Sequence, residues 1–343
     1  MAYTTIDKPT DYFNTVTYSG NGSSTQAITG VGHQPDWVWI KSRSHTENHM
    51  LSDAVRGSTK RLRSDTTNAE DDLGSNGIQS FNTDGFTAGD GDAMNASGQT
   101  YVAWNWKAGG STSSNSNGDL TSTVSVNTTA GFSICQWTSA DTGAVKTVGH
   151  GLGVKPDFII WKGYTRTVDW ITFHKSTGKD KNAGWLNTTH ASQNANYWGN
   201  TEPTSTVFST EGATEDSGTN IAYCFAEKKG YSKFSSYQGS GNSDGPMIVT
   251  GFKPAFVMIK RTDGADQWVI YDNKRTGFNV DNNPIFPNQS DAETTDDDMD
   301  ILSNGFKIRR NSGRVNTSGG TMIYMAFAES PFVSSTGIPT TAR

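Results

Sequence analysis

One hydrophobic pattern occurs three times along the chain. In each occurrence a glycine and a proline precede four consecutive apolar residues, at 37–40, 158–161 and 256–259, and a lysine closes the run. A continuous apolar run is typical of a strand that is buried on both faces, whereas a half-exposed strand alternates apolar and polar residues. We therefore predict that each run is a central strand of a layered β structure.

A second apolar strand follows each run at a nearly constant distance. These strands begin at Thr100, Thr219 and Thr321, between 63 and 67 residues after the proline of the preceding run. Asp-Gly at 84–85 and Asn-Gly at 304–305 separate apolar segments and predict hairpin turns. Two landmarks at matching separations indicate three internal repeats of roughly 95 residues each.

The predicted fold class is all-β, with tandem β-sandwich domains of a lectin-like or jelly-roll-like kind. Two packed sheets bury such central strands without helices; a closed barrel in each repeat is the alternative. Glycine, serine and asparagine dominate 109–119, which indicates a flexible linker. The expected organisation is an N-terminal arm at 1–13, β domains at 14–108, 120–230 and 231–332, the linker at 109–119, and a C-terminal tail at 333–343.

Composition and charge narrow the class of protein further. The chain has 37 glycines and 33% apolar residues, which favours short strands and turns over helices. Its net charge of −6 argues against a nucleic-acid-binding protein, which carries a basic face. No apolar run approaches the roughly 20 residues of a membrane span, so no membrane insertion is expected. The start of the chain has no basic segment before an apolar one, so no secretory signal is expected either.

No set of residues with catalytic or metal-binding spacing stands out. His33 lies in the first Gly-x-x-Pro run, where the other two copies have Val154 and Phe252. The acidic run at 296–300 lacks the spacing of an EF-hand calcium loop, and a solvated loop is the favoured interpretation. Cys135 and Cys224 lie in apolar segments and are expected to be buried free thiols. We therefore expect no catalytic residue, no metal and no cofactor.

Three aromatic residues are the candidate ligand contacts. Trp185, Tyr197 and Trp198 lie in a segment of the second repeat that is rich in asparagine and threonine. Exposed aromatic rings beside amides and hydroxyls are suited to stacking on a sugar or to contacting a protein partner. The alternative is that these rings cap the core of the β domain.

Several motifs resemble a family of virion structural proteins from marine tailed bacteriophages. The resemblance is carried by residues 1–15, 18–22 and 30–43, by Tyr-Val-Ala-Trp at 101–104, and by Phe-Ala-Glu at 225–227 and 327–329. Members of that family are often described as tail-fibre or lectin-like proteins. The resemblance implies a structural role in a virion, and no catalytic residue comes with it.

The expected function is a tail fibre or tail-associated adhesin that contacts the host surface, and not an enzyme. A capsid decoration protein is the first alternative, and a polysaccharide-degrading tailspike is the second. The expected partners are other virion proteins through the arm at 1–13, a host-surface glycan or envelope protein, and further copies of the chain, with a trimer as the expected homo-oligomer. The expected location is the virion, after assembly in the host cytoplasm.

Overall fold

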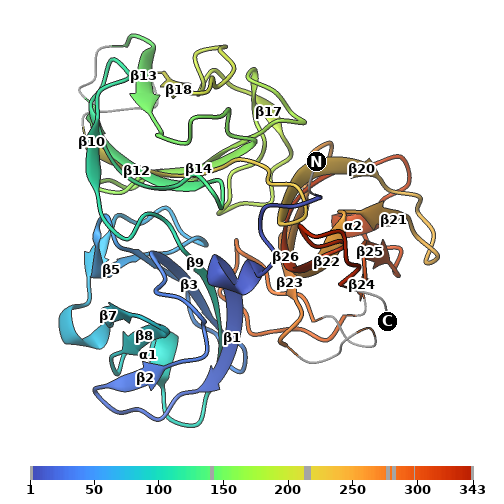
Figure 1. Ribbon diagram of the computed structural model, residues 1–343, viewed down its shortest axis with the longest axis horizontal. Helices are drawn as coiled ribbons and strands as arrows, with labels where there is room; N and C mark the ends of the chain where they lie inside the picture. Colours follow the sequence, from blue (N-terminus) through green and yellow to red (C-terminus); the bar gives the residue numbers. More distant parts are fainter. Residues whose placement is uncertain are drawn as a thin grey trace.

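The chain folds into three β units that surround a common centre (Figure 1). The computed structural model describes residues 3–139, 143–211, 218–275, 279, 283–296 and 298–340. All its sheets are antiparallel and, among the described residues, open rather than closed into a barrel. The predicted all-β sandwich class is therefore confirmed. None of the helices that the described residues form has the length and apolar character needed to cross a bilayer.

Unit 1 pairs a six-stranded sheet with a three-stranded sheet. The larger sheet has the order β1 (Phe13–Ser19), β9 (Thr100–Trp106), β3 (Trp37–Ser42), β4 (Met50–Asp53), β5 (Gly57–Leu62) and β6 (Asp71–Asp72). The smaller sheet has the order β2 (Gln26–Ile28), β8 (Gly85–Ala88) and β7 (Ile78–Asn82). Three single-turn helices complete the unit: η1 (Pro9–Asp11), η2 (Gly74–Asn76) and α1 (Asp92–Asn95).

Unit 2 contains one large sheet and two short antiparallel strand pairs. The large sheet has the order β10 (Ser113–Asn115), β11 (Ser122–Asn127), β12 (Phe132–Ser139), β19 (Gly218–Phe225), β14 (Phe158–Gly163) and β15 (Ile171–His174). The pairs are β13 (Lys146–Gly149) with β18 (Val207–Thr210), and β16 (Lys181–Asn182) with β17 (Gln193–Asn194).

Unit 3 resembles unit 1 in its two sheets. The larger has the order β20 (Ser232–Gln238), β26 (Thr321–Pro331), β22 (Phe252–Arg261) and β23 (Trp268–Asp272). The smaller has the order β21 (Met247–Val249), β25 (Gly305–Ile308) and β24 (Met299–Leu302), and the helix α2 (Gly313–Asn316) precedes β26.

The large sheets share one strand order. Each large sheet contains four neighbouring strands that appear in the same spatial order. This order is β1-β9-β3-β4 in unit 1, β12-β19-β14-β15 in unit 2 and β20-β26-β22-β23 in unit 3. Every residue of β3 and of β14 is buried, as the continuous apolar runs predict. Strands β1 and β20 have identical patterns of alternating burial. The three large sheets therefore share the same four-strand arrangement.

The two predicted hairpins are present. Asp-Gly at 84–85 joins β7 to β8, and Asn-Gly at 304–305 joins β24 to β25. A side chain at Gly85 would place its Cβ 2.0 Å from the carbonyl oxygen of Ile28. The same atom at Gly305 would lie 1.9 Å from the carbonyl oxygen of Ile248. Glycine is therefore required at both positions because the neighbouring strand approaches too closely for any side chain.

Each unit has a core between its sheets, and a fourth core is shared by all three units. At the centre of the shared core the last aromatic residues of β9, β19 and β26 meet. The ring centroids of Trp106 and Phe225 are 6.5 Å apart, those of Phe225 and Phe327 are 5.8 Å apart, and those of Trp106 and Phe327 are 5.7 Å apart. This aromatic triangle places one ring from each unit at the common centre.

A second set of rings links each unit to a neighbour in cyclic order. The strand that begins the shared four-strand order in each unit, β1, β12 or β20, places one phenylalanine against the central strand of another unit. The ring centroids are 5.7 Å apart for Phe13 and Phe256, 5.9 Å for Phe132 and Trp37, and 6.2 Å for Phe234 and Phe158. Unit 1 thus packs on unit 3, unit 2 on unit 1, and unit 3 on unit 2. The three units form a closed ring rather than a string of separate domains.

The same cyclic order governs hydrogen bonds between the units. In each unit one ring reaches a backbone carbonyl of the neighbouring unit. These rings belong to His49, which precedes β4, to Trp170, which precedes β15, and to Trp268, the first residue of β23. His49 Nδ1 accepts a hydrogen bond from the Trp39 indole, so His49 Nε2 carries the proton. The contacts are His49 Nε2 to Phe286 O (2.9 Å), Trp170 Nε1 to Arg63 O (2.8 Å) and Trp268 Nε1 to Trp185 O (3.0 Å).

The lysine that closes each apolar run is completely buried near these boundaries. Lys162 donates to Thr67 O of unit 1 at 2.8 Å, and Lys260 donates to Thr189 O of unit 2 at 3.1 Å. Burial lowers the pKa of Lys41 to about 8, of Lys162 to about 7 and of Lys260 to about 8. The cause is the loss of water around the ammonium group.

We expect the thermal unfolding midpoint to rise as the pH increases from about 7 to about 8.5. The window ends there because, at higher pH, the cysteines of the unfolded chain become fully ionised and act in the opposite direction. In this window the unfolded chain keeps its lysines protonated, while folded Lys162 and its two counterparts lose protons. The unfolded state then binds more protons, so stability increases with pH. Lys162→Met should reduce the slope, whereas Lys274→Met, at an exposed lysine, should leave it unchanged. A flat or falling midpoint in the native chain would contradict the expectation.

Two expectations about the connecting segments are corrected. The segment 109–119 is not a free linker, because it contains β10, which pairs with β11 at the edge of the unit 2 sheet. The described part of the N-terminal arm folds onto its own chain: Ile6 is 2% exposed within the shared core, and the Tyr3 hydroxyl donates to Gly251 O at 2.7 Å. In the described part of the C-terminal tail, Val333 and Pro339 form a β-bridge.

Candidate functional site

Trp198 is not a ligand contact, although the sequence made it a candidate. Its side chain is 0% exposed and lies in the core of unit 2, with ring centroids 5.8 Å from Trp161 and 5.6 Å from Phe173. A ring with no exposed face has no surface on which a sugar can stack. The alternative interpretation, that this aromatic residue caps the core, is the one that applies to Trp198.

Trp185 and Tyr197 are partly exposed and form an aromatic pair. Their rings meet edge to face with centroids 6.2 Å apart, and the ring of His190 lies 5.6 Å from that of Trp185. Partial burial raises the pKa of the Tyr197 phenol. The carbonyl of Trp185 accepts the hydrogen bond from Trp268 of unit 3, so the pair is anchored to the boundary between units 2 and 3.

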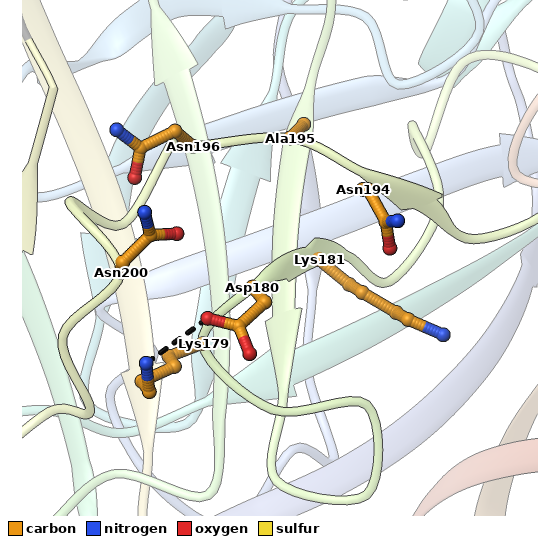
Figure 2. A pocket seen from close by; sticks show the side chains of 7 residues that line it. All are labelled: Lys179, Asp180, Lys181, Asn194, Ala195, Asn196 and Asn200. Carbon is orange, nitrogen blue, oxygen red and sulfur yellow. Dashed lines mark hydrogen bonds and ion pairs between the residues drawn. The ribbon is translucent and has the colours of Figure 1, made fainter.

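A polar pocket lies beside the same segment of unit 2. It has a volume of about 650 Å³ and is formed around the β16–β17 pair and the turn that follows it (Figure 2). We call it the hairpin pocket; its lining residues are Lys179, Asp180, Lys181, Asn194, Ala195, Asn196 and Asn200. Ala195 is the one apolar side chain among them.

Hydrogen bonds hold the walls of the hairpin pocket in place. The backbone N–H of Ala195 donates to Asp180 O at 3.2 Å, which ties the two sides of the pair together. The backbone N–H of Lys179 donates to the Glu202 carboxylate at 3.1 Å. Asn200 has a φ of 50°, a left-handed conformation that asparagine adopts more readily than most residues. The pocket is therefore shaped by backbone geometry.

Sequence reasoning identified part of this site. It singled out the segment around Tyr197 for its aromatic residues and asparagines, but not Lys179, Asp180 and Lys181, which precede it. Those residues reach the pocket because Lys181 pairs with Asn194 and Asn182 with Gln193. Two-residue strands leave no periodic signal in a sequence, so this pairing could not have been found from the pattern.

The charged groups of the hairpin pocket differ in their partners. The Asp180 carboxylate pairs with the Lys179 ammonium at 3.0 Å. It is the one carboxylate in the lining. Glycoside hydrolysis in most families requires two carboxyl groups on opposite sides of the scissile bond. This lining thus offers hydrogen-bonding groups for a ligand but not the usual pair for sugar cleavage.

The remaining candidate groups from the sequence are the metal-ligating residue types, the acidic run at 296–300 and the two cysteines. The described residues contain no group of three or more His, Cys, Asp or Glu side chains placed to hold a metal ion. Asp298 is buried and bonded to the Tyr271 hydroxyl and the Arg314 guanidinium, so this part of the acidic run is an ion-pair network rather than a solvated loop. Asp297 lies outside the described residues. Cys135 and Cys224 are buried free thiols, as expected, with sulfurs 4.0 Å apart.

These features define an all-β protein built from three linked sandwich units, with a polar pocket on the second unit. The chain belongs to the family described as Domain of unknown function (DUF7483), whose sequence pattern matches residues 8–331. No curated protein and no solved structure matches the chain.

Proposed function

We propose that the protein is a structural component of a bacteriophage virion, a tail fibre or tail-associated adhesin that contacts the host surface. The observation that carries the proposal is the contrast within unit 2. One face of its large sheet packs on the shared core, whereas β16 and β17 pair only with each other and line a polar pocket. A rigid body with a separate polar binding feature suits attachment rather than catalysis.

The resemblance of the N-terminal motifs to virion proteins of marine tailed phages supports the same role. The proposed partner outside the virion is a host glycan or envelope protein, reached through the hairpin pocket and the Trp185–Tyr197 pair. We do not assign the contact with other virion proteins to the arm, because Tyr3 and Ile6 are used within the chain. A homo-oligomeric assembly in the virion, with no enzymatic activity, completes the proposal.

The location of the protein on the particle tests this role. Antibodies raised against the full chain, labelled with gold, are applied to particles of the virus that encodes it, and the copy number is measured by quantitative mass spectrometry. The proposal expects label at the tail and tens of copies or fewer. Label over the whole capsid with hundreds of copies would instead assign a decoration protein, and particles without label would contradict both roles.

A further inference from the structure

The hairpin pocket has an uneven distribution of charge. Lys179 is neutralised by Asp180, while the Lys181 side chain extends away from that pair (Figure 2). Lys181 is exposed and has no carboxylate within ion-pair distance among the described residues. The lining therefore presents one available positive charge, on a chain whose net charge is −6. A single unpaired ammonium in an acidic protein favours a ligand whose negative groups are well separated from one another.

The remaining polar groups of the lining are carboxamides. Asn194, Asn196 and Asn200 each offer two N–H donors and one carbonyl acceptor. The side chains of Asn196 and Asn200 point toward one another across the pocket (Figure 2). Asn196 Oδ1 is buried and has no hydrogen-bond partner within the protein. A buried acceptor without a partner is costly, and a turn of the Asn196 carboxamide toward a ligand hydroxyl in the pocket would relieve that cost.

Taken with its size, this lining selects a class of ligand. Pockets of 300–1,000 Å³ typically hold small ligands but are mostly apolar, whereas this one has a single apolar side chain in its lining. An apolar ligand would bury the side-chain amides without hydrogen-bond partners, which is unfavourable. A nucleic acid would require several cations to neutralise neighbouring phosphates. A polyhydroxylated ligand with spaced carboxylates fits both the amides and the single free ammonium.

We propose that the hairpin pocket binds an acidic saccharide, with the Lys181 ammonium on a sugar carboxylate and the carboxamides of Asn194, Asn196 and Asn200 on ring hydroxyls. This inference rests on the proposed host-surface role and names the chemical class of the ligand. Because a charge-assisted hydrogen bond is worth about 1.5–3 kcal/mol, removal of the ammonium should weaken binding by roughly 10-fold or more.

Titration calorimetry with the full chain tests the inference. The probes are trigalacturonic acid and the same trisaccharide with its carboxylates reduced to hydroxymethyl groups. We expect the acidic probe to bind the native chain, the reduced probe to bind at least roughly 10-fold more weakly, and Lys181→Gln to lose a similar factor for the acidic probe. Lys274→Gln makes the same charge change at an exposed lysine of unit 3 and should leave binding unchanged.

Several results would overturn the inference. These are no binding of the acidic probe, equal binding of the two probes, or an unchanged affinity in Lys181→Gln. Lys181 is exposed, so the variant is expected to unfold at the same temperature as the native chain, which separates loss of binding from loss of folding. If the acidic probe does not bind while gold label marks the tail, the ligand class is wrong and the proposed adhesin role stands. If the acidic probe binds while the label lies elsewhere on the particle, the ligand class stands and the tail role is wrong.

Discussion

Phe225→Ala is expected to lower the free energy of unfolding by about 3–5 kcal/mol, the range for removing a large aromatic residue from a packed core. Phe225 is 1% exposed and is a corner of the aromatic triangle. Its ring also contacts Phe132 at 4.8 Å and Phe234 at 6.1 Å. Because these partners come from all three units, the loss should weaken the whole ring and not unit 2 alone.

Urea denaturation followed by tryptophan fluorescence and by circular dichroism measures this effect. Both signals should shift together to a lower midpoint in the variant. Phe332→Ala is the matched control, because Phe332 is 38% exposed and its removal should cost less than about 1 kcal/mol. A similar small change in Phe225→Ala would show that the triangle does not stabilise the chain.

Asp53→Ala should destabilise the protein by as much as about 3–5 kcal/mol, because it removes one of the two carboxylates that pair with the buried Arg56 guanidinium and leaves only the half-buried Glu70. Asp53 and Arg56 have side chains that are 0% and 1% exposed and are joined at 2.6 Å. The same carboxylate accepts a hydrogen bond from the Tyr223 hydroxyl of unit 2 at 2.8 Å. The substitution therefore removes an ion pair within unit 1 and a contact between units at once.

The matched control is Asp72→Ala, which breaks an exposed ion pair with Lys60. Exposed pairs contribute about 0–1 kcal/mol, so the control should unfold almost like the native chain. The comparison is made by urea denaturation at neutral pH. If the two variants have equal stability, the buried pair is not a major stabilising contact.

The buried carboxylate has a counterpart in unit 3 and a substitute in unit 2. Asp272 pairs with Arg275 at 2.7 Å and accepts from the Trp104 indole of unit 1 at 3.0 Å. In unit 2 the equivalent position is His174, whose Nδ1 accepts from the Ser176 N–H, so its Nε2 donates to Tyr324 O of unit 3 at 3.2 Å. Different side-chain chemistry thus makes the same cyclic contact in the three units.

Local features of the fold could be predicted from the sequence. The continuous apolar runs became fully buried strands, and the two Asp/Asn-Gly turns became hairpins, because both signals depend on near neighbours in the chain.

The ring arrangement could not be predicted in the same way. A pattern shows that Phe225 and Trp106 are buried but not whether the partner sheet belongs to the same unit or to another. The composition of 109–119 predicted a flexible linker, but residues 113–115 form the edge strand β10. An edge strand is held by backbone hydrogen bonds, so its serine side chains can remain exposed and leave no hydrophobic signal. At the candidate site, Tyr197 and Trp198 are adjacent yet turn to opposite sides, one partly exposed and one fully buried.

The most direct test of the shared core is native-state hydrogen exchange resolved along the chain. We expect the amides of β9, β19 and β26, the strands that carry the aromatic triangle, to exchange with one common free energy of opening. Phe225→Ala should lower this value equally in all three strands. Loss of protection confined to β19, with β9 and β26 unchanged, would contradict the claim that the three units fold as one body.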